Sequence, residues 1–281
     1  MPAKFKAVLS LFRPFNGVLV MVSVLVGAYL AHHQPAVLLE SRVWLMAFIT
    51  CLVTFGANAG NDYFDLEIDR INRPERPLPS NRLRPDSALF LCIFLLLFSL
   101  YLASWLGPHI TGLVFIAVFI SFFYTPFFKR WGIIKNLTIA FNVSLAFICG
   151  GIVAGNVHHA FFLSLFGFFI SVYRELLKDI FDCDGDRINQ VHTIPVKYGI
   201  ETAWRLSLFS LLCLGFSIFW AYFHENYTLL FLIMETGLVF LPLIAHTLWV
   251  YHSGFSLYTV RWGLRLSKLL MMVGLAVFFV N

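Results

Sequence analysis

Charged residues are scarce in this sequence, and its cysteines form no pattern typical of a disulfide framework or a metal site. Only 12% of the 281 residues are Asp, Glu, Lys or Arg, whereas soluble domains carry about 25%. This shortage excludes an ordinary water-soluble domain. The five cysteines contain no C-x-x-C pair, and four of them lie in apolar runs, so we interpret them as small packing residues.

Hydrophobic residues make up 59% of the chain, and the mean hydropathy is +0.81. Several continuous apolar runs approach the length of about 20 residues that a helix needs to cross a bilayer. They lack the alternation of barrel strands. The sequence therefore predicts an all-α integral membrane protein with one domain over residues 1–281. Nine spans are expected, at residues 15–31, 43–60, 88–106, 109–127, 135–155, 159–178, 203–223, 227–249 and 264–280.

The first 14 residues are basic and amphipathic and show no small-residue cleavage pattern. They predict an interfacial helix that leads into the first span, and no cleaved signal peptide is expected.

The connections between the predicted spans alternate between basic and nearly uncharged. Nineteen of the 20 Lys and Arg residues fall on one side, and only Arg42 falls opposite. Because basic connections mark the cytoplasmic side, we expect a cytoplasmic N-terminus and, with nine spans, a C-terminus outside. Twelve of the 15 acids share the basic side, the exceptions being Glu40, Glu225 and Glu235. This mixture of charges indicates a polar site at the cytoplasmic face.

Two aspartate motifs share the spacing D-x2-D-x3-D, and each follows an even-numbered predicted span. They lie in connections expected at about residues 61–87 and 179–202, and consist of Asp62, Asp65 and Asp69, preceded by Asn61, and of Asp179, Asp182 and Asp186. At these offsets the side chains fall near one face of a helix. Because stacked like charges repel, cations must compensate them.

Paired carboxylate clusters suit Mg2+, which prefers oxygen ligands and usually takes one or two carboxylates together with substrate phosphates. Two such half-sites facing a gap predict a diphosphate held between metal ions, with basic side chains around it.

Three other interpretations of the acids are weaker. A solvated charged loop does not explain the duplicated spacing. A calcium loop starting at Asp182 fails because Arg187 stands where glycine is needed and Thr193 stands where glutamate is needed. A proton or ion pathway would place acids in mid-membrane, where only Glu235 lies. A transporter or lipid-binding protein with an acidic cytoplasmic vestibule therefore remains the non-enzyme alternative.

The motifs carry a family resemblance. NDYFDLEIDRINRPERPLPS (61–80) resembles the first signature of the UbiA superfamily of intramembrane prenyltransferases, and RELLKDIFDCDGDRINQVHTIPVKYG (174–199) resembles the second. YTPFFK (124–129) is similar to the family's Tyr-Ser/Thr-x-x-x-Lys element. The resemblance implies nine helices in a ring around a central cavity that opens to the cytoplasm. It also implies transfer of a prenyl group from its diphosphate to an acceptor.

The same resemblance assigns roles to individual residues. It implies two Mg2+ ions held by Asn61, Asp62, Asp65, Asp179, Asp182 and Asp186. The expected catalytic residues are Asp65, Asp69, Asp182 and Asp186. The implied substrate-binding residues are Asn16, Arg73, Tyr124, Lys129, Lys178, Arg187 and Lys197. Lys129 equally fits an ordinary positive-inside residue, and Tyr124 fits a tyrosine of the interfacial belt.

The acceptor is less closely defined than the reaction. RPFNG (13–17) and the two signatures look most like the branch that transfers a geranylgeranyl group to geranylgeranylglyceryl phosphate, forming an ether bond. An aromatic acceptor such as 4-hydroxybenzoate, a naphthoate or a quinone precursor is the alternative. Surplus basic residues agree with a phosphorylated acceptor, namely Lys4, Lys6, Arg13, Arg187 and Lys197.

One position departs from the family pattern. Asn81 stands where the family often has glycine after Pro-Ser, and asparagine can adopt the left-handed conformation that a turn needs. The expected partners are a prenyl diphosphate, a lipophilic acceptor and membrane lipid. No nucleic acid is expected, and no protein partner can be inferred.

Overall fold

The computed structural model describes residues 3–124, 127, 132–188, 190–225 and 227–280. Within these ranges the secondary structure is helical, and no β-strand occurs among the described residues. The predicted all-α class is confirmed.

Eight helices of the described residues are long and apolar enough to cross a membrane. They are α2 (Pro14–His32), α3 (Ser41–Phe64), α5 (Pro85–Ser104), α7 (Ile133–Val153), α8 (His158–Ile188), α10 (Ile200–His224), the run Leu229–His252, and the run Leu257–Val280. The span expected at 109–127 corresponds to α6 (Pro108–Phe123), whose 16 residues fall short of the usual span of about 20. The structure thus supports eight spans by length, and the count of nine is not confirmed.

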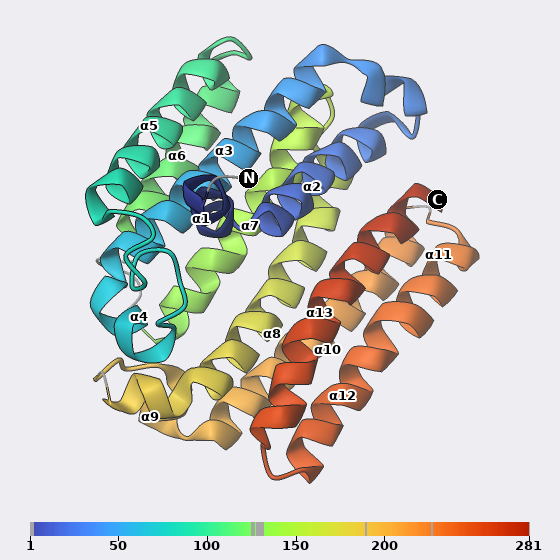
Figure 1. The fold of residues 1–281 in the computed structure, drawn as a ribbon. Helices are drawn as coiled ribbons and strands as arrows, with labels where there is room; N and C mark the ends of the chain where they lie inside the picture. The colour runs from blue at the N-terminus through green and yellow to red at the C-terminus, as the bar shows by residue number, and fades with distance from the viewer. Residues whose placement is uncertain (1–2, 125–126, 128–131, 189, 226, 281) are drawn as a thin grey trace.

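The remaining elements are short. The run 229–252 consists of α11 (Leu229–Met234), a π-helical turn η3 (Glu235–Phe240) and α12 (Leu241–His252), and the last run consists of α13 (Leu257–Val277) and η4 (Phe278–Val280). The connections contain η1 (Pro35–Leu39), α4 (Leu66–Asn72) and α9 (Ile194–Tyr198). In Figure 1, α4, α9 and the α12–α13 turn lie at the lower end, whereas η1 and the C-terminus lie at the upper end.

Both aspartate motifs lie largely on helices, which corrects the expectation of loops beginning at residues 61 and 179. Helix α8 continues to Ile188, ten residues past the predicted limit of 178. Helix α3 ends at Phe64, Asp65 forms the junction, and α4 starts at Leu66. The helices continue because the acids meet cationic side chains across a polar cavity and do not face lipid.

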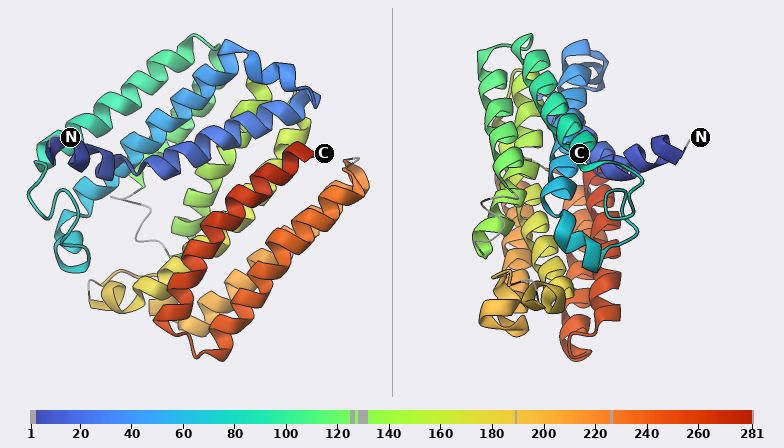
Figure 2. Two further views of the ribbon diagram at one scale, coloured as in Figure 1. Left: turned by 45° about the vertical axis from the view of Figure 1, so that its right-hand side comes forward. Right: turned by 60° about the vertical axis from the view of Figure 1, so that its left-hand side comes forward.

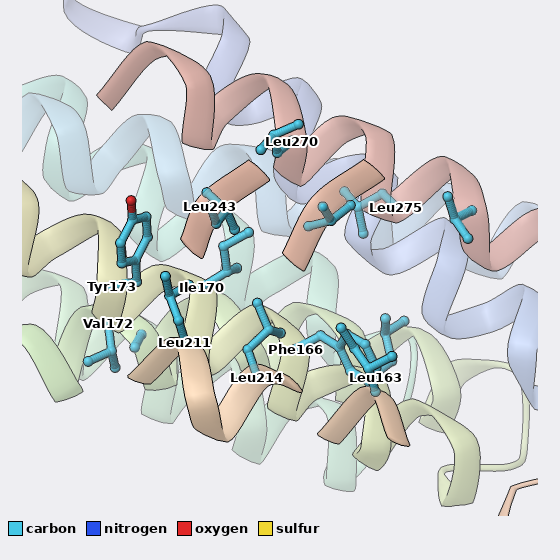
Figure 3. Close-up of a cluster of buried hydrophobic side chains, with 14 of the residues drawn as sticks. Leu163, Phe166, Ile170, Val172, Tyr173, Leu211, Leu214, Leu243, Leu270 and Leu275 are labelled. Atoms are coloured by element: carbon cyan, nitrogen blue, oxygen red, sulfur yellow. The ribbon is translucent and has the colours of Figure 1, made fainter. Parts of the chain in front are cut away.

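The helices pack in chain order. Each of α2, α3, α5, α6, α7, α8, α10, α12 and α13 contacts the next, and α13 returns to α2. Figure 3 shows part of the apolar core between α8, α10, α12 and α13, with side chains that include Leu163, Phe166, Ile170, Leu211, Leu214, Leu243, Leu270 and Leu275. Helix α7 contacts both of the motif-bearing helices, α3 and α8.

The N-terminal helix α1 (Ala3–Phe12) projects from the bundle, as the right-hand view of Figure 2 shows. Its buried side chains are Ala7 and Leu11, while Phe5 and Leu9 are exposed. The Phe12 ring stacks on Phe55 of α3 with centroids 4.9 Å apart. This amphipathic arrangement is compatible with the predicted interfacial helix.

Helices α2 and α7 approach closely through two glycines. A Cβ on Gly150 would lie 2.1 Å from the carbonyl oxygen of Val24, and one on Gly27 would lie 2.3 Å from that of Phe147. Neither position has room for a side chain, so the two backbones are in direct contact. Asn81 has a φ of 56°, which confirms that it takes the left-handed conformation.

We expect Gly150→Ala to lower the melting temperature, because its Cβ would force α2 away from α7. Overpacking of this kind costs about 1–3 kcal/mol. Thermal unfolding in detergent micelles measures the change. Gly112→Ala in α6 is the matched control, since a Cβ there meets nothing within 4 Å and alanine gains about 1 kcal/mol of helix propensity. A Gly150→Ala variant as stable as the wild type would contradict the close contact.

Candidate active site

A cavity of about 610 Å³ lies among the helices, a size typical of small-molecule sites. Its polar part contains both aspartate motifs, with Asn61, Asp65 and Asp69 from the α3–α4 side and Asp179, Asp182 and Asp186 from α8. Arg73, which follows α4, extends toward α8 and lies 3.6 Å from an Asp182 carboxylate oxygen. The structure therefore brings the two motifs together at one cavity.

Asp62 has a different position from the one predicted for a metal ligand. It is 2% exposed and is not among the residues that line the cavity. One of its carboxylate oxygens accepts hydrogen bonds from Arg13 and from Arg76, the latter at 3.2 Å. We therefore assign Asp62 to the positioning of these two arginines. The spacing alone placed it near the ligand face but did not reveal the arginines that occupy its carboxylate.

Arg76 joins Asp62 to Asp69, because it also donates to the Asp69 carboxylate. Burial raises the pKa of the Asp69 carboxyl, and the Arg76 charge opposes this rise. Burial lowers the pKa of the Arg13 guanidinium, against the attraction of Asp62. Arg13 has a left-handed backbone (φ 53°) between α1 and α2, and this bend directs its guanidinium to Asp62 and Asn58.

On the other wall, Asp179 is held by α7. Lys135 donates to one of its carboxylate oxygens, and the Asn136 side chain donates to the other at 3.0 Å. Both oxygens thus have protein partners, and the side chain is buried. One turn earlier, Glu175 accepts from Arg174 at 3.1 Å and from Lys178 at 3.4 Å. These pairs compensate the buried acids of α8.

Four of the predicted substrate-binding residues line the cavity, namely Asn16, Arg73, Tyr124 and Lys178. Burial raises the pKa of the Tyr124 phenol well above its ordinary value, and the charges of Glu175 and Asp179 add to the rise. The phenol therefore remains protonated and can donate a hydrogen bond.

Two predicted residues lie elsewhere, and a third is not described. Arg187 is exposed and does not line the cavity, and Lys197 lies over the Tyr198 ring, 5.1 Å from its centroid. Lys129 lies outside the described residues. Arg187 follows Asp186 directly, so on a continuous helix it points about 100° away from the aspartate face. The sequence predicted Arg187 in a connection between spans, where no helix would fix the direction of its side chain.

The comparisons with known proteins agree with this arrangement. The model of the UbiA prenyltransferase family matches residues 20–279. The chain belongs to the UbiA prenyltransferase family. Digeranylgeranylglyceryl phosphate synthase of Methanosphaera stadtmanae is 31% identical over 200 residues, which cover 71% of this chain and 72% of that protein.

Solved structures of UbiA relatives share the fold. A structure from a study of digeranylgeranylglyceryl phosphate synthase in membranes superimposes with a TM-score of 0.79 at 25% identity, covering 99% of this chain and 98% of its own. A UbiA homologue from Archaeoglobus fulgidus bound to GPP and Mg2+ has a TM-score of 0.72 at 18% identity, covering 97% of this chain and 99% of its own.

Sequence reasoning did not assign several residues of this UbiA cavity to the site. They are Asn58, Arg76, Lys135, Arg174, Glu175 and Lys268. Glu175 had a usable signal, since it lies four residues before Asp179 and so shares its helix face. The basic residues had none, because a basic residue in a cavity and one that only marks the cytoplasmic side occur in the same connections.

The apolar part of the cavity extends along α8, η3, α13 and η4, where its lining includes Leu163, Phe166, Leu270, Leu275 and Phe278. Glu235, the acid that the sequence placed in mid-membrane, lies on this wall and is 1% exposed. Its Oε1 atom has no hydrogen-bond partner among the described residues. The acid starts a π-helical turn, a feature that is frequent at functional sites.

We expect Lys135→Met to destabilise the protein by about 3–5 kcal/mol, because it leaves the Asp179 carboxylate buried without its cation. Adding Asp179→Asn should restore part of the loss, since the charge is then gone. Thermal or denaturant unfolding of the single and double variants measures this coupling.

The control for the Lys135 and Asp179 variants is Arg205→Met, which breaks the exposed ion pair of Arg205 with Glu201, 2.7 Å away. A surface pair contributes only about 0–1 kcal/mol. The assigned role of Lys135 would be wrong if its variant were no less stable than Arg205→Met.

Proposed function

We propose that the protein transfers a geranylgeranyl group from its diphosphate to geranylgeranylglyceryl phosphate, in a Mg2+-dependent reaction that forms an ether bond. The observation that carries the proposal is the meeting of two aspartate motifs at one cavity, joined by Arg73 across to Asp182. The name of the relative from Methanosphaera stadtmanae supports the acceptor. The GPP and Mg2+ bound to the UbiA homologue from Archaeoglobus fulgidus support the donor and the metal.

The donor set fits a hard divalent cation. Asn61 and Asp65 supply amide and carboxylate oxygens on one wall, and Asp182 and Asp186 supply carboxylates one helical turn apart on the other. Such oxygens, completed by substrate phosphates and water, are what Mg2+ prefers. We propose one ion for each pair of residues. When bound, Mg2+ supplies positive charge that stabilises the departing diphosphate.

The chain's own residues complete the reaction. Arg73, Lys178 and Tyr124 donate hydrogen bonds to diphosphate oxygens as the bond between the allylic carbon and oxygen breaks and its electron pair leaves with the diphosphate. The acceptor hydroxyl oxygen then forms a new bond to that carbon, and its proton passes to an oxygen of the released diphosphate. Apolar side chains along α8 and α13 exclude water, which would otherwise compete as the nucleophile.

A phosphorylated acceptor requires positive charge beyond the diphosphate site. Arg13, Arg174 and Lys268 all line the cavity. We propose that these three residues bind the acceptor phosphate. The sequence predicted Arg13 in this role. It also predicted Arg187 and Lys197, which do not line the cavity, and we assign the role to Lys268 in their place.

We further propose the membrane orientation that the basic connections indicate. The N-terminus, α1 and the polar end of the cavity face the cytoplasm, and α1 lies in the interface. The C-terminus faces outside, which requires α6 to cross the bilayer as the ninth span. The whole chain acts as one domain with membrane lipid as its surroundings.

We expect Asp65→Asn and Asp182→Asn each to abolish prenyl transfer while the protein remains folded, because each removes a carboxylate from one half of the site. The measurement is the amount of labelled product formed from radiolabelled geranylgeranyl diphosphate and the acceptor in the presence of Mg2+. Asp184→Asn is the matched control, since Asp184 is exposed on the same helix and does not line the cavity. Full activity in both test variants would exclude the proposed role of these two aspartates. Absence of prenyl transfer by the wild-type protein would exclude the proposed enzyme and favour the transporter or lipid-binding alternative.

The acceptor is tested separately by supplying geranylgeranyl diphosphate with either geranylgeranylglyceryl phosphate or 4-hydroxybenzoate. We expect product from the phosphorylated lipid. Product from the aromatic acid alone would overturn this acceptor and leave the prenyltransferase chemistry intact.

Lys268→Met is expected to raise KM for geranylgeranylglyceryl phosphate about tenfold, which corresponds to about 1.4 kcal/mol, with a much smaller effect on KM for the diphosphate. The reason is the loss of one charge-assisted contact to the acceptor phosphate. Lys197→Met, at an exposed lysine outside the cavity, should leave both constants unchanged. Equal changes in the two KM values for Lys268→Met would contradict the separate acceptor site.

A further inference from the structure

Three potential metal ligands gather at the end of the bundle remote from the aspartates. His158 and His159 begin α8, and Glu225 follows directly after α10. Twenty-four residues of continuous helix separate His158 from Asp182, a distance of about 36 Å at 1.5 Å per residue. This group is therefore separate from the proposed Mg2+ site.

The three side chains converge on one carboxylate oxygen. Nδ1 of His159 lies 2.9 Å from Glu225 Oε2, and Nδ1 of His158 lies 3.2 Å from the same atom. One ligand atom from each residue lies within 4.8 Å of the other two. Tetrahedral Zn2+, with bonds of about 2.0–2.1 Å, places its ligand atoms about 3.3 Å apart. The spacing thus agrees with ligands that share one ion.

The hydrogen bonding at this group is incomplete. Glu225 Oε2 and His159 Nδ1 are both buried, and neither has a hydrogen-bond partner among the described residues, although only 2.9 Å separates them. The Glu225 side chain is 5% exposed. Burying a carboxylate without a satisfied partner is costly. A cation between the carboxylate and the two imidazoles would satisfy both atoms.

We propose that His158, His159 and Glu225 form a binding site for a borderline divalent transition-metal cation such as Zn2+. Two imidazoles with one carboxylate suit this class, whereas Mg2+ prefers oxygen ligands throughout. His158 is largely exposed, with 66% of its side-chain surface accessible, so the ion is reachable from solvent and water completes its coordination.

Such an ion would link the start of α8 to the end of α10. The His33 ring, just after α2, packs edge-on against the His159 ring with centroids 5.3 Å apart. His33 thereby restrains the orientation of His159, as groups beside metal ligands commonly do. The site would thus hold the ends of α8 and α10 together on the side of the membrane opposite the aspartates, and it does not depend on the proposed reaction.

The test uses the full chain with a tag that contains no histidine, purified in detergent, stripped with EDTA and kept in excess Mg2+ to block the aspartate cavity. Zn2+ is titrated against a chromophoric chelator. We expect one saturable site per chain and a rise in melting temperature with Zn2+. Glu225→Gln should weaken the affinity at least about 100-fold, because loss of even a supporting group costs 10–100-fold.

Two controls separate this site from others. His109→Gln changes an exposed histidine elsewhere and should leave the affinity unchanged. The Asp65→Asn, Asp182→Asn double variant should retain the Zn2+ site, which distinguishes it from the aspartate cavity.

Co2+ provides a measurement on the wild type alone, since tetrahedral binding to imidazole and carboxylate gives an intense visible absorption. The proposal is overturned if Zn2+ binding is not saturable, or if Glu225→Gln binds Zn2+ as tightly as the wild type. It is also overturned if binding disappears in the double aspartate variant. Any of these results would leave the group as an ion pair between histidines and Glu225.

Discussion

Charge compensation across the cavity is the constraint on which the rest of the structure depends. Acids from α3, α4 and α8 lie in a mostly apolar bundle, where an unpaired carboxylate is costly. Arg76 therefore contacts both Asp62 and Asp69, and Lys135 contacts Asp179. The Lys135 contact holds α8 against α7, and the Arg76 contacts hold the segment after α4 against α3 and α4. Asp182, whose Arg73 partner lies 3.6 Å away, is held less tightly.

This difference suggests a division of labour within each motif. The innermost acids, Asp62 and Asp179, are 2% exposed and accept hydrogen bonds from arginine, or from lysine and asparagine. They position the helices and the basic side chains. The acids three residues further along, Asp65 and Asp182, line the cavity and carry the proposed metal chemistry. The repeated spacing thus places one positioning acid on each wall, with the proposed ligand acids further along the chain, Asp65 on one wall and Asp182 and Asp186 on the other.

Much of the fold could be predicted from the sequence, because apolar length is a local property. The left-handed Asn81 could be predicted for the same reason, since turn chemistry is also local. The end of α8 could not, since residues 179–188 look like a charged loop until their cationic partners on α7 are known. The role of Lys135 was hidden for a related reason. A basic residue that marks the cytoplasmic side and one that pairs with Asp179 look identical in the sequence.

Helix α8 connects the two ends of the molecule. Its C-terminal turns carry Asp179, Asp182 and Asp186, and its first residues carry the histidines that meet Glu225. Glu225 was one of three acids that did not follow the others to the basic side of the sequence, and its burial beside two imidazoles gives that exception a physical reason. A rigid helix of 31 residues thus carries the proposed reaction at one end and a structural anchor at the other.

The central claim is that both aspartate motifs act together on one diphosphate through divalent cations. The most direct test is the affinity of the unreactive analogue geranylgeranyl thiodiphosphate for the purified protein, titrated with Mg2+ and with EDTA. The account predicts tight binding that requires Mg2+ and that is lost when either motif alone is altered. Binding of equal strength in EDTA, or binding that survives the loss of one motif, would contradict it.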